Sequence, residues 1–458
     1  MSTARGSHLA LAWIAAVTAL VWASSGAFHP LIVAIGPKPV AFQPPVAVFE
    51  AGPVQTAATL LAAAGIAEVS QLRYLAVDGR AALQALPVGS GERRYFDAAS
   101  GTPIVDGDRA RAISLARHYS GEPSAEVRST RLVKHYDRDY PWINRLLPVW
   151  AVAFEGEAGT IVYVDTGGDR LGTMSGASKR FWQGLFQTLH TLSFIELPYL
   201  RPAAIGLMVG LFFVTVTLGA TMLLRRGGQQ RSRRFHRRLA WIAVVPALLF
   251  PATGLFKLAT DELPGPSAPQ PPAISTAQLS ALPFAAGDGE LIEAVAVPVF
   301  GGAPVWRVLA LRDEEPRPSL REVDGSAISG GDEALARRIA SGAYGAEVSE
   351  APSLVSAFDR DYGFANKRLP VWLATGPTGQ RWYFETRSGL VAAQLGGPYA
   401  ALKESQGLLF NLLHKGHFLD PLGITPNQRN LVMSGLAASI VLTALFGLAM
   451  KPRRRPRS

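Results

Sequence analysis

The sequence contains no cysteine. Disulfides, zinc–thiolate sites, iron–sulfur clusters and thiol catalysis are therefore excluded. Charged residues are also scarce, since they make up 17% of the 458 residues while hydrophobic residues make up 48%. An average soluble domain carries about 25% charged residues. The composition therefore indicates a membrane protein.

Catalytic and nucleotide-binding fingerprints are missing as well. The chain has no Walker loop, dinucleotide-binding glycine motif, nucleophile elbow or HExxH zinc motif. A flavin or nicotinamide domain is therefore not expected. If the protein carries out a reduction, its electrons come from a separate cytoplasmic or quinone donor.

Four uncharged apolar stretches are present, and each is long enough to cross roughly 30 Å of hydrocarbon as a helix. The expected order is a helix within 1–28, an outer segment at 29–202, a helix at 203–224, a basic loop at 225–238, a helix at 239–256, an outer segment at 257–430, a helix at 431–450 and a basic tail at 451–458.

Arginines gather in the 225–238 loop and in the 451–458 tail. Short segments rich in Lys and Arg stay on the cytoplasmic side of a bilayer. We therefore expect both termini to be cytoplasmic and the two outer segments to be extracytoplasmic. The net charge of +10 is then a topology signal, and nucleic-acid binding is not expected.

The first apolar stretch has an alternative interpretation as a cleaved secretory signal peptide. However, LAWIA at 11–15 recurs at 239–243, and SGAF at 25–28 is echoed by TGLF at 253–256. The second copy is internal and cannot be a leader. We therefore expect residues 9–28 to be a retained transmembrane helix.

A longer stretch also occurs twice, as DRDYPWINRLLPVW at 137–150 and as DRDYGFANKRLPVW at 359–372. Each copy precedes a strand-like YVDT or YFET piece and then an LH pair. Such an internal repeat indicates that one half of the chain was duplicated. Helical and strand patterns in each outer segment are typical of a small α+β domain. The predicted fold class is an integral membrane α-helical protein with four transmembrane helices, a two-fold internal repeat and two extracytoplasmic α+β domains.

The aspartates of the repeated stretch have three interpretations: metal ligands, a general acid–base set, or parts of a structural joint. They are Asp137, Asp139, Asp359 and Asp361. No glycine or closing glutamate follows at the spacing of a calcium loop. The favoured interpretation is a joint in which aspartate caps a turn, Arg138 and Arg360 pair with nearby carboxylates, and Pro-Val-Trp begins a hairpin.

Taken together, these parts resemble the PepSY-associated transmembrane proteins of bacteria. The resemblance is carried by His-x-x-Leu-Ala-Trp-Ile-Ala at a helix start, by outer units ending in YVDT or YFET, and by an LH-led segment before the next helix. It covers nearly the whole chain. It implies two PepSY-like outer domains and a place in the bacterial cytoplasmic (inner) membrane. By resemblance to the best-understood members, the protein would be a reductase that binds b-type haem and reduces ferric siderophores in the periplasm.

Two pairs of histidines match across the repeat, His8 with His236 and His190 with His414. A haem iron takes two axial imidazoles, and a four-helix bundle can hold the cofactor in its core. His190 and His414 are the expected iron ligands of one or two b haems. The two pairs, one at each membrane face, would give an electron a route across the bilayer. The alternative is that these histidines are interfacial residues with their rings among the lipid headgroups.

The remaining histidines do not match across the repeat. His29 and His417 have Lys257 and Ser193 as partner positions, so ligation, a hydrogen bond to a propionate or substrate, and a structural role all stay open. His118 and His135 lie in the first outer segment, where we expect surface or core roles.

Three functions follow from these patterns. The first is a haem-dependent electron-transfer protein that acts on a periplasmic ferric chelate or siderophore. The second is a non-enzymatic membrane protein whose PepSY-like domains bind peptides or regulate periplasmic proteases. The third is a transporter, which the absence of charge inside the predicted helices disfavours.

Overall fold

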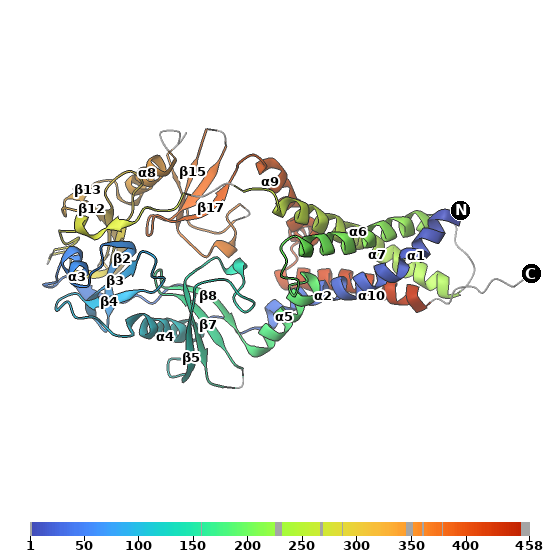
Figure 1. The fold of residues 1–458 in the computed structure, drawn as a ribbon, viewed down its shortest axis with the longest axis horizontal. Helices are drawn as coiled ribbons and strands as arrows, with labels where there is room; N and C mark the ends of the chain where they lie inside the picture. The colour runs from blue at the N-terminus through green and yellow to red at the C-terminus, as the bar shows by residue number, and fades with distance from the viewer. Residues whose placement is uncertain are drawn as a thin grey trace, which may run out of the picture. The chain divides into compact units, whose positions relative to one another are not determined.

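The chain folds into two compact units in the computed structural model, which describes residues 2–156, 158–224, 231–265, 269–285, 287–344, 351–359, 361–377 and 379–449. The helical unit comprises Met1–Gly36, Ala177–Gly265 and Pro398–Ser458, and the sheet unit comprises Pro37–Gly176 and Pro266–Gly397. Figure 1 shows the helices and strands of both units. Residues 177–202 and 398–430, which the sequence prediction placed in the outer segments, group with the helices.

Four helices among the described residues are long and apolar enough to cross a membrane, as predicted; the candidate spans are Ala10–Ile32, Leu200–Leu223, Arg234–Asp261 and Pro426–Ala449. They are formed by α1 (Ser2–Thr18), η1 (Ala19–Ala23), α2 (Ser24–Ile35), α6 (Leu200–Leu223), α7 (Arg231–Asp261) and α10 (Pro426–Ala449). Helix α7 begins ahead of residue 239, so the second part of the predicted basic loop is helical. Residues 225–230 and the basic tail at 451–458 lie outside the described residues.

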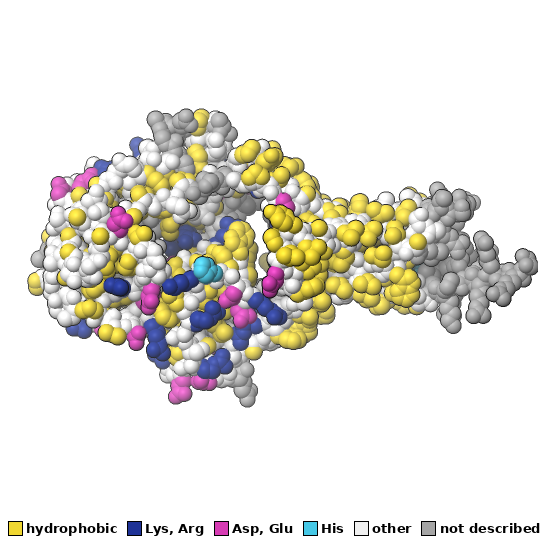
Figure 2. Space-filling model, in the orientation of Figure 1, with side chains coloured by type: hydrophobic (Ala, Val, Ile, Leu, Met, Phe, Trp, Pro, Cys, Tyr) yellow, Lys and Arg dark blue, Asp and Glu magenta, His cyan; other side chains and the backbone are white. Residues whose placement is uncertain are grey.

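The outward-facing side chains of these helices are apolar. Leu207 is 66% exposed, Trp241 52% and Leu431 62%, and Figure 2 shows hydrophobic side chains covering the visible face of the helical unit. Soluble proteins rarely expose an apolar surface of this extent. The helical unit therefore has the surface of a membrane protein.

Small side chains line the interior of the helical unit. Ala15 and Ala19 come from the first span, Ala243 and Ala247 from the third, and Ala437 from the fourth. Small residues let helices approach closely, which favours van der Waals packing in a bilayer. Larger groups fill the remaining space; they are Trp22, Phe212, Phe250, Met433 and Ile440.

Short helices continue the helical unit beyond the long ones. They are α5 (Ala177–His190), which precedes α6, and α9 (Ala400–Leu409), η6 (Phe410–His414) and η7 (His417–Leu422), which precede α10. Helix α5 packs on α2, and η6 packs on α7. His190 and His414 are the last residues of α5 and η6.

The sheet unit is organised around one nine-stranded sheet with the order β13-β12-β11-β10-β2-β3-β4, in which β1 also pairs with β10 and β9 with β2. The strands are β1 (Phe49–Glu50), β2 (Glu68–Val77), β3 (Arg80–Pro87), β4 (Arg94–Asp97), β9 (Ile274–Ser275), β10 (Glu290–Val297), β11 (Val305–Arg312), β12 (Glu315–Arg321) and β13 (Ala327–Ile328). Strands β2 and β10 are antiparallel neighbours, with Tyr74 opposite Ala294.

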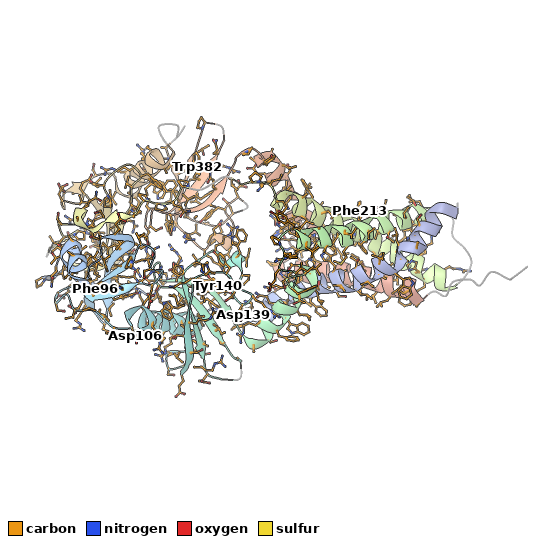
Figure 3. The ribbon with its side chains drawn as sticks, viewed as in Figure 1. Phe96, Asp106, Asp139, Tyr140, Phe213 and Trp382 are labelled. Atoms are coloured by element: carbon orange, nitrogen blue, oxygen red, sulfur yellow. The ribbon has the colours of Figure 1, made fainter. Side chains whose placement is uncertain are left out.

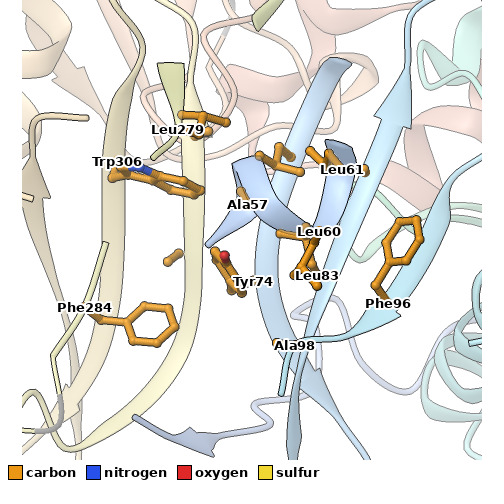
Figure 4. Close-up of a cluster of buried hydrophobic side chains, with 14 of the residues drawn as sticks. Ala57, Leu60, Leu61, Tyr74, Leu83, Phe96, Ala98, Leu279, Phe284 and Trp306 are labelled. Atoms are coloured by element: carbon orange, nitrogen blue, oxygen red, sulfur yellow. The ribbon is translucent and has the colours of Figure 1, made fainter. Parts of the chain in front are cut away.

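This shared sheet differs from the two separate outer domains that we predicted. If each half formed its own sheet, β2 and β10 would be edge strands with unpaired N–H and C=O groups. Their pairing satisfies these groups and joins the two repeats. The hydrophobic core also joins the two repeats. Figure 4 shows Tyr74 and Leu83 from the first half packed with Phe284 and Trp306 from the second.

Two four-stranded sheets complete the sheet unit, one from each repeat. The first has the order β5 (Val127–Val133), β6 (Val149–Phe154), β7 (Ile161–Asp165), β8 (Arg170–Ser175), and the second the order β14 (Ser353–Val355), β15 (Val371–Thr375), β16 (Arg381–Phe384), β17 (Val391–Leu395). Helix α4 (Gly107–Ser120) packs on the first sheet through Leu115 and Tyr119. Helix α8 (Gly331–Tyr344) packs on Trp372 and Trp382 of the second through Leu335.

The repeated DRDY stretch forms the joint that precedes β6 or β15. Oδ1 of Asp137 accepts hydrogen bonds from the backbone N–H groups of Asp139 and Tyr140, at 2.9 and 2.7 Å. The buried Tyr140 donates to the carbonyl of Leu146 at 3.1 Å; Figure 3 labels Asp139 and Tyr140.

The second copy repeats these contacts. Oδ1 of Asp359 accepts from the N–H groups of Asp361 and Tyr362 at 2.8 and 2.6 Å, and Tyr362 donates to the carbonyl of Arg368 at 2.9 Å. The geometry supports the structural interpretation of this stretch. Arg360 lies outside the described residues.

Buried charges link the repeats at the centre of the sheet unit. The central charge network consists of Arg73, Arg111, Asp169, Glu293 and Arg387. Arg73 on β2 lies 2.7 Å from Asp169 and 3.2 Å from Glu293 on β10. Arg387 lies 2.6 Å from the same glutamate. Buried charges persist in folded proteins only when they are paired in this way.

Candidate functional site

The histidines that match across the repeat occupy equivalent places in the helical unit. His190 ends α5 and lies against the first span, and His414 ends η6 and lies against the third. The sequence explains the placement, since both follow an apolar run with helical spacing.

The imidazole of His190 is held by one hydroxyl, one carbonyl and two aromatic rings. Its Nδ1 atom lies 3.1 Å from Oγ of Ser25 and 3.2 Å from the carbonyl oxygen of Trp22. The ring stacks on the indole of Trp22 with centroids 5.0 Å apart, and on Phe186 at 4.7 Å. Contacts on the ring nitrogen and on the ring faces together define the orientation of the imidazole.

His414 has the matching environment in the second repeat. Its Nδ1 atom lies 3.1 Å from Oγ1 of Thr253, the residue that corresponds to Ser25. Its ring stacks on Phe410 with centroids 4.4 Å apart and contacts Phe250, the counterpart of Trp22, at 5.3 Å. Trp22 also reaches this ring edge-on at 6.2 Å. The two imidazoles, which are 224 positions apart in the chain, therefore share one indole.

Both imidazoles are neutral near pH 7. Burial lowers the pKa of His190 to about 3, and the nearby His414 contributes in the same direction. Burial likewise lowers the pKa of His414 to about 4. A neutral imidazole that donates from Nδ1 keeps a lone pair on Nε2. This is the tautomer that ligates a metal through Nε2.

The second matched pair lies near the N-terminal ends of α1 and α7. Nδ1 of His8 is 3.1 Å from the carbonyl oxygen of Thr215 on α6. The Cε1 atoms of His8 and His236 each lie 3.2 Å from where a Cβ would stand on Gly219 and Gly447. A larger residue at either glycine would push the imidazole aside. The counterpart of the Thr215 contact in the second repeat joins His236 to the backbone of Thr443 on α10.

The unmatched histidines differ from these pairs. His29 packs on Phe186, the ring that also stacks on His190, with centroids 4.3 Å apart. Nδ1 of His417 lies 2.8 Å from a carboxylate oxygen of Asp420 and 3.0 Å from Nη1 of Arg429. His118 and His135 belong to the sheet unit.

The donor set limits what kind of metal group these histidines could hold. The described part of the chain contains no group of three or more His, Cys, Asp or Glu residues arranged for a metal ion. A haem iron needs fewer protein ligands, because the porphyrin supplies four ligands and the chain one or two. The two matched pairs fit such a group, because a polar contact orients each of the four imidazoles. One group bound to both His190 and His414 would have to displace the indole of Trp22.

The sequence analysis did not identify Trp22, Ser25 and Thr253 as residues of the site. The signal for the two hydroxyl residues was present in the SGAF and TGLF segments, which we used only as evidence for the repeat. In both repeats the ring that packs on the histidine lies three positions before the hydroxyl that faces it, a spacing that puts both on one helix face.

Comparisons with known proteins do not add a family or an activity. The chain matches no model of a known protein family, and no protein of curated function matches it. Its function is therefore inferred from its own residues and from the resemblance described above.

Proposed function

We propose that the protein is a PepSY-associated electron-transfer protein of the bacterial inner membrane that holds b-type haem and passes electrons to a periplasmic ferric chelate such as a siderophore. Both termini are cytoplasmic in this proposal, and the sheet unit lies in the periplasm. The donor is a separate cytoplasmic protein or a quinone.

The membrane part of the proposal draws on the four apolar helices and on the arginines. Exposed leucines and tryptophans on the spans need a hydrocarbon environment. The arginines at 225–238 and 451–458 orient these spans with the basic segments inward. The sheet unit then lies on the opposite side, because its two segments connect the far ends of the helices.

The observation that carries the redox part is the matched setting of His190 and His414. Each Nδ1 atom lies 3.1 Å from a hydroxyl of a neighbouring span, and each ring stacks on a phenylalanine four residues earlier in the chain. The hydroxyl contact and the ring stack occur in both repeats, which favours ligation over a purely interfacial role.

The residues have separate tasks in this proposal. Ser25 and Thr253 orient the imidazoles, while Trp22, Phe186 and Phe410 exclude water and lipid from their faces. His8 and His236 provide a second pair about 20 Å away along the first and third spans, given 1.5 Å of rise per helical residue. A bound b haem supplies one-electron oxidation and reduction at its iron.

A second candidate function is peptide binding by the sheet unit, with regulation of periplasmic proteases. The observation that favours it is a pocket of about 440 Å³ beside β4 and the start of α4, lined by groups that include Arg93, Tyr95, Asp108 and Trp150. Such a pocket offers both charge and an aromatic wall to a ligand. The peptide-binding function predicts that the histidine pairs can be replaced without loss of function.

The absorption spectrum of detergent-purified protein decides between the two. We expect a sharp reduced α band after dithionite and one or two haems per chain. His190→Ala or His414→Ala should remove at least half of the bound haem, and His118→Ala, which changes a histidine of the sheet unit, should remove none. A colourless protein from haem-supplied cells would exclude the redox proposal and favour the second candidate.

A further inference from the structure

The two repeats differ in charge next to the matched histidines. Phe410 stacks on His414, and the ammonium groups of Lys257 and Lys415 lie over the Phe410 ring, 5.9 and 5.8 Å from its centroid. In the first repeat the positions of these lysines hold His29 and Thr191. The lysine pair therefore exists beside only one of the two matched imidazoles.

The lysine pair is incompletely neutralised by the described residues. Lys257 lies 2.6 Å from Asp261. Lys415 has no carboxylate within salt-bridge distance among the residues that the structure describes, and its electrostatic neighbours are two further cations, Lys257 and Arg429. Arg429 and His417 are already engaged by Asp420. Three basic side chains thus share two carboxylates among the described residues, and Lys415 is the one that neither carboxylate reaches.

Cations gathered without an equal number of carboxylates repel one another unless an anion joins them. We propose that Lys257 and Lys415 bind a carboxylate group beside His414, which makes the second repeat the anion-binding half of the site. The inference rests on the proposed function for the identity of the ligand. The carboxylate belongs either to the cofactor, as a haem propionate, or to an iron chelate that carries carboxylates.

A haem propionate and a chelate carboxylate can be recognised by the same two lysines beside Phe410. The ammonium groups of Lys257 and Lys415 lie 5.9 and 5.8 Å from the centroid of the ring that stacks on His414, so an anion bound by both lysines lies near the imidazole. An ammonium pair recognises a carboxylate by charge and hydrogen bonding and does not distinguish its carrier. Only the response of each ligand to loss of the lysines can do so.

The chain itself supplies the test variant. Lys257→His with Lys415→Thr installs the residues that the first repeat has at these positions. The charge-keeping Lys257→Arg with Lys415→Arg is the matched control, and Lys179→Gln removes a lysine of α5. Each full-length protein is measured for haem content and for binding of ferric citrate, followed by quenching of tryptophan fluorescence. Circular dichroism verifies folding.

We expect the histidine–threonine variant to lose either haem or affinity for ferric citrate. The double arginine variant should keep both, and Lys179→Gln should lose neither. Losing two charge-assisted contacts should weaken binding about tenfold or more. Weaker ferric citrate binding with unchanged haem identifies the chelate as the source, and lower haem content with unchanged ferric citrate binding identifies the propionate. A colourless wild type whose ferric citrate binding still depends on the lysines would retain this inference and end the redox proposal. Unchanged haem content and ferric citrate binding in the folded histidine–threonine variant would overturn the inference.

Discussion

Oγ1 of Thr253 lies 3.1 Å from Nδ1 of His414. The same distance separates Oγ of Ser25 from Nδ1 of His190 in the other repeat. Hydroxyl and imidazole come from different helices in both cases, so each contact also ties a span to the short helix that precedes the next one.

Removal of these hydroxyls should loosen the imidazoles without unfolding the protein. We expect Ser25→Ala with Thr253→Ala to weaken haem binding about tenfold or more, because partners that orient a ligating histidine contribute about that much to affinity. Haem titration of the apoprotein measures the effect. Thr217→Ala is the control, since among the described residues this hydroxyl bonds the carbonyl of Phe213 in its own helix and no histidine. Equal affinities in both variants would argue against ligation by these histidines.

The central charge network should make the sheet unit sensitive to acid. Burial alone would raise the pKa of Glu293, but Arg387 and Arg73 outweigh it and lower the pKa to about 2. The unfolded chain has the ordinary glutamate pKa of 4.5. The stabilisation is therefore present above about pH 4.5 and is lost as the pH falls towards 2. Thermal unfolding between pH 2 and 7, followed by far-ultraviolet circular dichroism, measures this loss.

A charge deletion in the same network should be costly. Glu293→Gln removes one of the two carboxylates that Arg73 and Arg387 share, the other being Asp169. Breaking a buried ion pair costs about 3–5 kcal/mol of unfolding free energy. Glu322→Gln removes a partly exposed partner of Arg338 and should change stability by less than about 1 kcal/mol. Similar losses in the two variants would contradict the structural role of the network.

The DRDY joints should contribute to stability and leave bound haem unchanged. Tyr140→Phe removes one buried hydrogen bond to the carbonyl of Leu146, which should cost about 1 kcal/mol. Asp137→Ala removes two contacts to backbone N–H groups and should cost about 1–2 kcal/mol. Denaturant unfolding measures both losses. A change in haem content without a change in stability would instead indicate a functional aspartate.

The absence of cysteine makes the topology directly testable. A single cysteine introduced by Ser124→Cys, in the sheet unit, should react with a membrane-impermeant maleimide in cells whose outer membrane is permeabilised. One introduced by Gly228→Cys, in the basic loop, should react only after lysis. The reverse pattern would place the basic segments outside and contradict the charge-based orientation.

The four spans could be predicted from residue order because hydrophobic length and charge-free runs act locally. The joint could be predicted for the same reason, since Asp137 caps its own turn within three residues. The helix boundaries were less accurate. Helix α7 begins in the predicted basic loop at Arg231, because arginine has a high helix propensity and its charge does not prevent helix formation at a membrane surface.

The pattern of residues along the chain was thus enough for the repeat, the spans and the matched histidines. It could not show that β2 pairs with β10 in one sheet, that Arg73 meets Glu293 across that pairing, or that Trp22 touches both His190 and His414. Each of these contacts joins residues more than 160 positions apart. Such contacts depend on which surfaces remain unpaired after local structure has formed, and that is decided only when the whole chain packs.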